Sequence, residues 1–147
     1  MNPDHDIVIN YGAVLAAAVA KFALGALWYT ALFGMKWAKL EGIKMDKNMP
    51  MGKPLTIDFV QGLVYAYALA CVADMSGILG NWRHGLCLGI FIGVGFNATV
   101  LLAANTWRKK PFKLFLIDAS YQVLVATLMS VIIAAFTKAP EMKPPGI

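Results

Sequence analysis

Charged residues are scarce in this sequence of 147 residues: 14% are Asp, Glu, Lys or Arg, whereas 59% are hydrophobic. Soluble domains carry about 25% charged residues, because their surfaces face water. The mean hydropathy is +0.63. This composition excludes an ordinary soluble domain and predicts a protein whose apolar side chains face lipid as well as one another.

Cysteine and histidine are also rare, with two of each. Cys71 and Cys87 lie in different apolar runs without a CxxC pair, so we expect buried apolar side chains rather than a disulfide. A metal site needs three or four converging ligands, and no HxxxH or CxxC spacing supplies them. Nucleophile elbows, phosphate-binding loops and dinucleotide fingerprints are also missing. We therefore predict no catalytic residues, no metal and no cofactor.

Four long apolar runs dominate the sequence instead. About 20 apolar residues in a helix cross the hydrocarbon core of a bilayer. The runs predict spanning helices over residues 7–33, 54–75, 82–106 and 114–136. We interpret residues 1–147 as one all-α integral membrane domain, a four-helix bundle with an extended or disordered tail over 137–147. Its two helical hairpins resemble each other weakly, because the second helix of each has an early aspartate, Asp58 or Asp118.

Most basic residues lie in two predicted loops, 34–53 and 107–113. Nine such residues stand against three on the other side of the bundle: Lys36, Lys39, Lys44, Lys47, Lys53, Arg108, Lys109, Lys110 and Lys113 against Arg83, Lys138 and Lys143. Because Lys and Arg mark cytoplasmic loops, this count predicts that both termini lie outside the cytoplasm. Residues 35–40 are either a short amphipathic helix on the membrane surface or part of a solvated loop.

Lys21 is the one charge within the first apolar run. A lysine near the middle of a spanning helix costs about 2.5–3.5 kcal/mol, so it needs a partner or water. By helical rise, Asp118 lies within reach of Lys21, and Asp58 is the competing partner. Such an intramembrane charged pair either lies on a proton or solute path, fixes helix register, or faces a partner subunit. We favour the structural and interface interpretations.

Gly85, Gly89 and Gly93 form a GxxxGxxxG ridge, which is typical of tight helix packing within a chain or between copies. Aromatic residues near the ends of the runs are predicted to anchor the helices at the headgroup level. These interface anchors are Trp28, Tyr29, Trp37 and Trp107. Polar residues of the last three helices predict a seam of interhelical hydrogen bonds. They are Gln61, Tyr65, Tyr67, Asn97, Thr99, Asn105, Ser120, Tyr121 and Gln122.

Several stretches resemble a known family. They are AVAKFALGALWYTALFGMKWAKLEG from Ala18, KPLTIDF, GFNATVLLAANTW and KPFKLFLIDASYQVL. They are similar to small bacterial membrane proteins of the domain of unknown function 1761 family, over about residues 11–136. The most specific parts are GxLWYxxLFGxxW, from Gly25 to Trp37, and KLFLIxxxYQ, from Lys113 to Gln122. The resemblance implies four transmembrane helices in a bacterial inner membrane, and no known activity, substrate or cofactor.

Three hypotheses for function follow. The favoured one is a small non-enzymatic accessory or scaffold subunit that packs into a larger membrane complex or self-associates, because the chain is small and carries the glycine ridge. The second is a small oligomeric transporter or channel with Lys21, Asp58 and Asp118 along its path, and a membrane enzyme is the least favoured. The expected partners are the lipid bilayer and other membrane subunits or a second copy. Nucleic acid is not expected, because no basic stripe is interleaved with aromatic residues.

Overall fold

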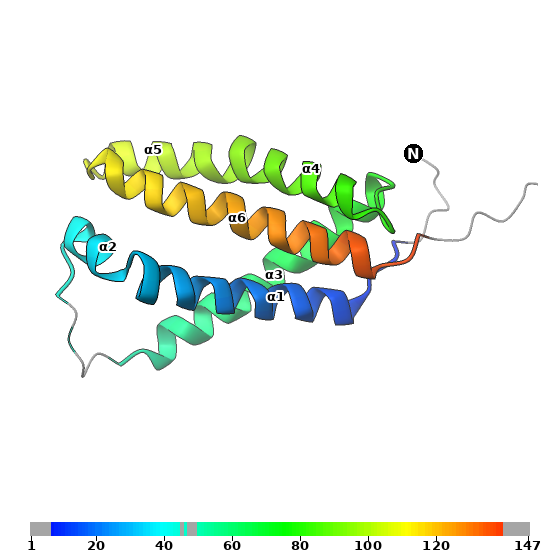
Figure 1. Ribbon diagram of the computed structural model, residues 1–147, viewed down its shortest axis with the longest axis horizontal. Coiled ribbons are helices and arrows are strands. Elements are labelled where there is room, and N and C mark those ends of the chain that lie inside the picture. Colours follow the sequence, from blue (N-terminus) through cyan, green and yellow to red (C-terminus); the bar gives the residue numbers. More distant parts are fainter. Residues whose placement is uncertain (1–6, 45, 47–49, 140–147) are drawn as a thin grey trace, which may run out of the picture.

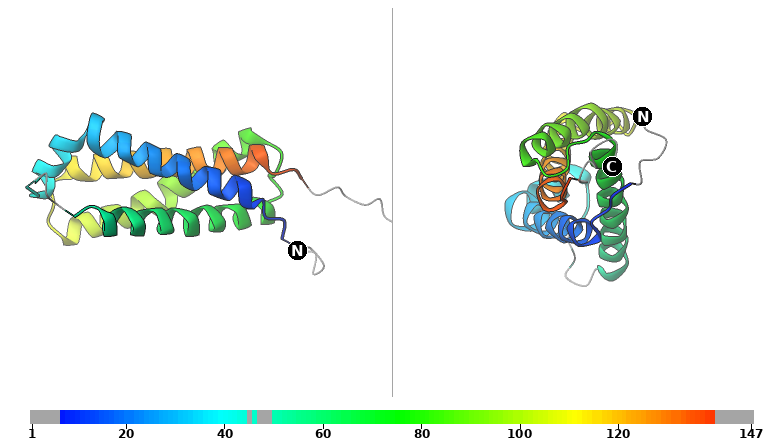
Figure 2. Two further views of the ribbon diagram at one scale, coloured as in Figure 1. Left: turned by 90° about the horizontal axis from the view of Figure 1, so that it is seen from below. Right: turned by 90° about the vertical axis from the view of Figure 1, so that its right-hand side faces the viewer.

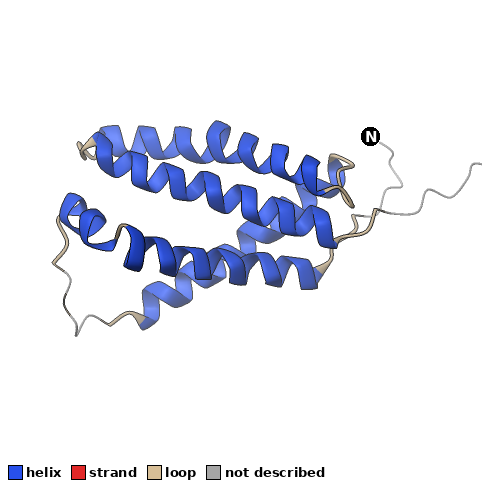
Figure 3. Ribbon diagram, in the orientation of Figure 1, coloured by secondary structure: helices blue, strands red, loops and turns tan. Residues whose placement is uncertain are grey.

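The computed structural model describes residues 7–44, 46 and 50–139, and their regular structure is entirely helical (Figure 3). The all-α class predicted from the sequence is thereby confirmed. The elements are α1 (Tyr11–Ala26), η1 (Leu27–Leu32), α2 (Gly34–Glu41), α3 (Gly52–Met75), α4 (Trp82–Ile92), η2 (Gly93–Ala98), α5 (Thr99–Trp107) and α6 (Phe112–Phe136). Most of the predicted extended tail lies outside the described residues, which end at Ala139.

Four continuous helical segments are long and apolar enough to cross a membrane, by length and composition. They are Tyr11–Leu32, Gly52–Met75, Trp82–Trp107 and Phe112–Phe136. These segments indicate a multi-pass membrane protein. Their basic loops lie at one end of the bundle, beside α2, which we call the basic end (Figure 1). The start of α1, the turn between α3 and α4 and the end of α6 lie at the opposite end.

Asparagine side chains cap the starts of the first and third spans. The first helix begins at Tyr11 and not at Ile7, because the Asn10 side chain accepts a hydrogen bond from the backbone N–H of Ala13 at 3.1 Å and caps the helix. The Asn10 side chain also donates to the backbone oxygen of Phe136 at 2.9 Å, which joins the start of α1 to the end of α6. Asn81 caps α4 in the same way, by accepting from the backbone N–H of Arg83.

Two π-helical segments interrupt the first and third spans, η1 at Leu27–Leu32 and η2 at Gly93–Ala98. The apolar pattern did not predict them. A π-helical turn contains about one residue more than an α-helical turn, and this small change in the spacing of side chains is not visible in a uniformly apolar run. After η1 the backbone of Phe33 leaves helical geometry, with φ −125° and ψ 0°, and α2 begins at Gly34. Residues 35–40 therefore belong to a helix, and its predicted position on the membrane surface stays a prediction.

α6 is the central helix of the bundle. It packs against α1, α3 and the α4–η2 segment, whereas the main neighbour of α4 among the described elements is α6. Figure 2 shows, end on, α4 and α1 on two sides of α6 and α3 beside α1. The side chains of α6 are accordingly the most buried of the four spans, and those of the Trp82–Trp107 span are the least buried.

The glycine ridge faces the backbone of α6. A Cβ atom at Gly85 would lie 2.6 Å from the backbone oxygen of Ser130, and one at Gly93 would lie 2.7 Å from the Cα of Val123. At Gly89 it would overlap the Cα of Thr127. Larger residues would therefore force the two helices apart. Cys87 lies on α4 between these glycines and is exposed, so its predicted burial is wrong, since α4 buries only its glycine face against α6.

The apolar core lies mainly towards the opposite end of the bundle. Small residues of α3 pack there against larger side chains of α6, including Val125, Met129 and Ile133. Every buried residue of α3 lies at Gly62 or later, and the first ten residues of the helix have none. α3 thus diverges from the bundle towards the basic end (Figure 1). This divergence positions the polar groove described below.

Gly89→Ala is expected to destabilise the protein by about 1–3 kcal/mol, because the added methyl group overlaps the backbone of α6. Gly95→Ala is the matched control: it lies in the same span, and a Cβ there meets nothing within 4 Å. Unfolding in mild detergent, followed by circular dichroism, measures both variants. Equal stability of the two would contradict the close packing of the ridge on α6.

Candidate functional site

The Lys21 side chain, which is 4% exposed, forms an ion pair with Asp58 across the contact between α1 and α3. Its Nζ lies 2.6 Å from Asp58 Oδ1 and donates to the backbone oxygen of Asp58 at 3.2 Å. The Asp58 side chain remains 48% exposed. Of the two partners considered for Lys21, the structure places Asp58 beside the ammonium group. Asp118 has other partners, described below, so the alternative pair of Lys21 with Asp118 is not formed.

Neighbouring residues shape the surroundings of this ion pair. A Cβ at Gly62 would lie 3.0 Å from Lys21 Cδ, so this glycine leaves room for the aliphatic part of the lysine. Tyr121 of α6 donates a long hydrogen bond, 3.4 Å, to the backbone oxygen of Lys21. A Cβ at Gly25 would lie 2.7 Å from the Tyr121 hydroxyl oxygen, so Gly25 makes room for the phenol. The sequence predicted that Lys21 forms a charged pair, but it did not predict that Gly62 and Gly25 make room for the side chains around it.

Two adjoining cavities form a groove between α3 and α6, which we call the polar groove. The first, of about 540 Å³, lies at the start of α3 and is lined by the ion pair, Lys53, Ile57 and Tyr121, among others. The second, of about 350 Å³, extends to η2 and α5. Gln61 and Gln122 line both cavities. The groove therefore runs from the basic end towards the middle of the span.

The predicted polar seam is formed only in part. Asn97 donates to the Tyr65 hydroxyl at 2.7 Å and joins η2 to α3. Thr99 and Ser120 instead donate to backbone oxygens of their own helices. Gln61 and Gln122 form no hydrogen bond within the part of the chain that the structure describes. An unpaired carboxamide at membrane depth costs free energy, so these two groups favour an additional polar partner in the groove.

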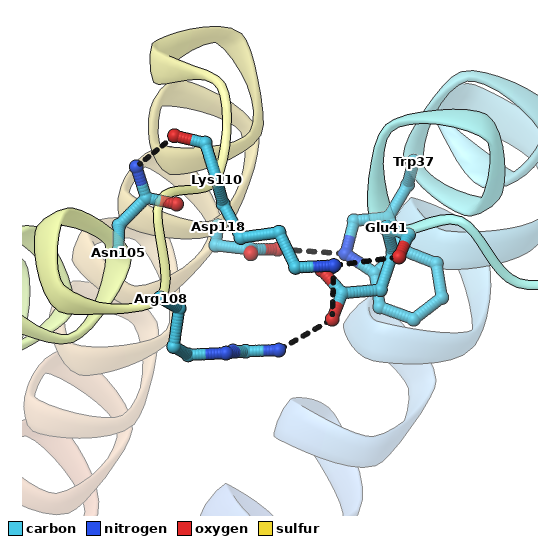
Figure 4. Close-up of polar contacts among 6 residues, drawn as sticks. All are labelled: Trp37, Glu41, Asn105, Arg108, Lys110 and Asp118. Atoms are coloured by element: carbon cyan, nitrogen blue, oxygen red, sulfur yellow. Dashed lines mark hydrogen bonds and ion pairs between the residues drawn. The ribbon is translucent and has the colours of Figure 1, made fainter.

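Asp118 lies at the basic end, near the start of α6, and accepts two hydrogen bonds from aromatic side chains. The Tyr29 hydroxyl donates to Asp118 Oδ1 at 2.8 Å. The Trp37 indole donates to the same oxygen at 3.0 Å, as Figure 4 shows. The rings of Tyr29 and Trp37 also contact each other edge to face, with centroids 5.3 Å apart. Asp118 thus ties η1 and α2 to α6.

Glu41, the last residue of α2, binds two basic residues from the turn between α5 and α6. Figure 4 shows Arg108 and Lys110 converging on it. The Lys110 ammonium lies 3.4 Å from Glu41 Oε1 and also donates to the backbone oxygen of Glu41 at 2.7 Å. Asn105 holds the turn by donating to the backbone oxygen of Lys110. Sequence reasoning did not single out this cluster; its one signal was an acidic residue in a largely basic loop.

The predicted interface anchors have different surroundings. The Trp28 indole donates to the backbone oxygen of Ile117, and Tyr29 and Trp37 bind Asp118, so these three residues hold protein partners. Trp107 is 87% exposed and keeps the surroundings expected of a headgroup anchor. Its anchoring role stays a prediction. The π-helical geometry of η1 brings Trp28 and Tyr29 to α6, where both rings contact Tyr121.

The double variant Lys21→Met, Asp58→Asn tests the energetic coupling of the ion pair. Asp58→Asn alone should cost about 1–3 kcal/mol, below the cost for a fully buried pair, because half of this aspartate is exposed. Lys21→Met alone should cost less, since the remaining carboxylate reaches water. Detergent unfolding of all four proteins gives the coupling energy. Additive effects of the two substitutions would contradict a stabilising pair.

Trp37→Phe should accelerate backbone hydrogen exchange across α2, because it removes the indole donor to Asp118 and keeps the aromatic ring. The cost to global stability should stay near 1 kcal/mol, the value of one hydrogen bond. Trp107→Phe is the control, since Trp107 is exposed at the end of α5. Unchanged exchange of α2 in Trp37→Phe would show that Asp118 does not hold this helix in place.

Comparisons with known proteins assign the chain to a family but not to a function. No curated protein and no solved structure matches the chain. A family model described as protein of unknown function, DUF1761, matches residues 12–134, which include all four spans except the first residue of α1 and the end of α6. The chain belongs to this family of proteins of unknown function.

Proposed function

We propose that this chain is a small non-enzymatic membrane subunit that self-associates, with a second copy covering the polar groove. The observation that carries this proposal is the pair of carboxamides, Gln61 and Gln122, which lack hydrogen-bond partners within the described residues. A carboxamide has both donors and acceptors, so the same groups on a second copy are complementary to it. Interhelical hydrogen bonds of this kind hold membrane helices together.

The use of the glycine ridge within the chain directs the proposal to the groove. Gly85, Gly89 and Gly93 lie against the backbone of α6, so they are not free to receive a helix from another copy. The exposed sides of α4 and α5 are apolar and suit lipid. The polar groove carries the unpaired carboxamides of Gln61 and Gln122, and it is where a partner helix offers more than lipid does.

The proposal includes location and orientation. The excess of Lys and Arg at the basic end favours a cytoplasmic position for α2 and the turn between α5 and α6, with both termini outside. The family resemblance favours the bacterial inner membrane. In this orientation the groove opens towards the cytoplasmic half of the bilayer.

Energy transfer between labelled copies in liposomes tests self-association. Cys87 is exposed and carries the dye after Cys71→Ala. Transfer should persist as the lipid-to-protein ratio rises, and Gln61→Leu with Gln122→Leu should weaken association about tenfold, because several interhelical hydrogen bonds are lost. Thr99→Val is the control, since Thr99 already bonds its own helix. Energy transfer no greater than expected for random proximity of the labelled copies would overturn self-association. A different protein that copurifies with the chain in equal amount would also overturn it, because that protein would then be the partner at the groove.

A small oligomeric transporter is the second candidate, and one observation favours it. The Lys21–Asp58 pair lines a cavity that continues through Gln61 and Gln122 to Tyr65 and Asn97. Intramembrane charges of this kind often mark solute or proton paths. An assembled Lys21→Met protein that has lost solute flux in liposomes would assign transport in place of a purely structural subunit.

A further inference from the structure

The larger cavity of the polar groove reaches the headgroup level of the membrane at its outer end. α3 has 24 residues and is about 36 Å long, whereas the hydrocarbon core is about 30 Å thick. The excess leaves part of its first turns in a headgroup layer about 5–7 Å thick. Lys53 is the second residue of α3, and Asp58 lies about 7.5 Å further along the axis. The cavity therefore extends from the headgroup layer, at Lys53, to the edge of the hydrocarbon core, at Asp58.

The charges of this cavity are unbalanced. Lys21 and Asp58 neutralise each other in a direct ion pair. Lys53 lines the same cavity and makes no ion pair within the described residues. The cavity therefore has one uncompensated positive charge, which is complementary to a ligand of one negative charge.

The remaining polar groups indicate more than a bare anion. The Asp58 side chain stays 48% exposed while Lys21 binds its Oδ1, so the carboxylate can accept further hydrogen bonds. Gln61 and Gln122 offer both donors and acceptors to the cavity. A ligand that combines a phosphate with neutral hydroxyl groups satisfies this set: the phosphate pairs with Lys53, and the hydroxyls, with the headgroup folded back beside the phosphate, donate to Asp58 and the carboxamide oxygens that line the same cavity.

An apolar strip continues from the cavity along α3. Ile57 lines the cavity and is 68% exposed, and Val60 and Val64, one and two turns further, are 52% and 65% exposed. Acyl chains attached to a headgroup in the cavity would lie along this strip. The adjoining strip is why the lipid is favoured here over a soluble phosphate.

We propose that the cavity at the start of α3 binds the headgroup of an anionic, hydroxylated phospholipid of the phosphatidylglycerol type, with its phosphate at Lys53. This site does not depend on the proposed self-association. It gives the polar groove a bound lipid at the basic end. Gln61 and Gln122 line both cavities, so the hydrogen bonds that the headgroup leaves unmade stay available to a partner or solute in the deeper part, near Tyr65 and Asn97.

Native mass spectrometry of the protein released from nanodiscs measures the bound lipid. In nanodiscs of phosphatidylcholine with a minor share of phosphatidylglycerol, the protein should retain phosphatidylglycerol. Lys53→Gln should weaken this retention about tenfold, the loss expected for one charge-assisted contact. Lys113→Gln is the matched control, because Lys113 is exposed and is also the second residue of a spanning helix at the basic end. Retention of phosphatidylglycerol should fall less than about fivefold in Lys113→Gln, because one lysine contributes about that much to the general attraction of a protein to an anionic surface.

Three outcomes would overturn the site. Equal losses of phosphatidylglycerol retention in Lys53→Gln and Lys113→Gln would show that the lipid is held by general charge attraction and not at a specific site. In nanodiscs that also contain an equal minor share of phosphatidylethanolamine, equal retention of that lipid would exclude recognition of the negative charge. Displacement by soluble glycerol phosphate would assign the cavity to a soluble anion. The oligomeric state read in the same spectra distinguishes failure of this site from failure of self-association. Unchanged unfolding of Lys53→Gln excludes a folding defect as the cause of any loss.

Discussion

The need to neutralise one ammonium group inside the bilayer constrains the basic half of this bundle. Lys21 lies on a helix that is otherwise apolar, and an unpaired charge there would be too costly to keep. Its contact with Asp58 joins α1 to α3, and Gly62 is small enough to let the lysine pass. The pair holds α3 to α1 where α3 has separated from α6. The polar groove exists because α3 is fixed in this position.

The two halves of the bundle are stabilised in different ways. Towards the opposite end, alanines of α3 and large side chains of α6 form an apolar core, and Gly85 and Gly89 bring α4 against the α6 backbone. Close packing of small residues is the main attraction between helices in lipid, where apolar burial contributes little. Towards the basic end, polar contacts replace this packing.

The short helix α2 belongs to the polar half. Asp118 accepts hydrogen bonds from Tyr29 and Trp37, and Glu41 binds Arg108 and Lys110 from the turn between α5 and α6. These contacts hold α2 at the basic end of the bundle, against η1 and α6 (Figure 4). Glu41 and Asp118 therefore attach α2 to the bundle. Among the described carboxylates, Asp58 is the one that lines the groove.

The sequence by itself determined the class, the four spans and the uneven distribution of basic residues, because length and apolarity decide which helices fit a bilayer. It also identified Lys21 and both aspartates, since charges are conspicuous in apolar runs. It left open which aspartate pairs with Lys21, and it did not indicate η1, η2 or the cluster at Glu41. Helical rise gives depth along the membrane normal but not which faces of two helices meet. Only the tertiary structure decided that Asp58 faces Lys21, that Asp118 faces Trp37, and that the glycine ridge is used within the chain.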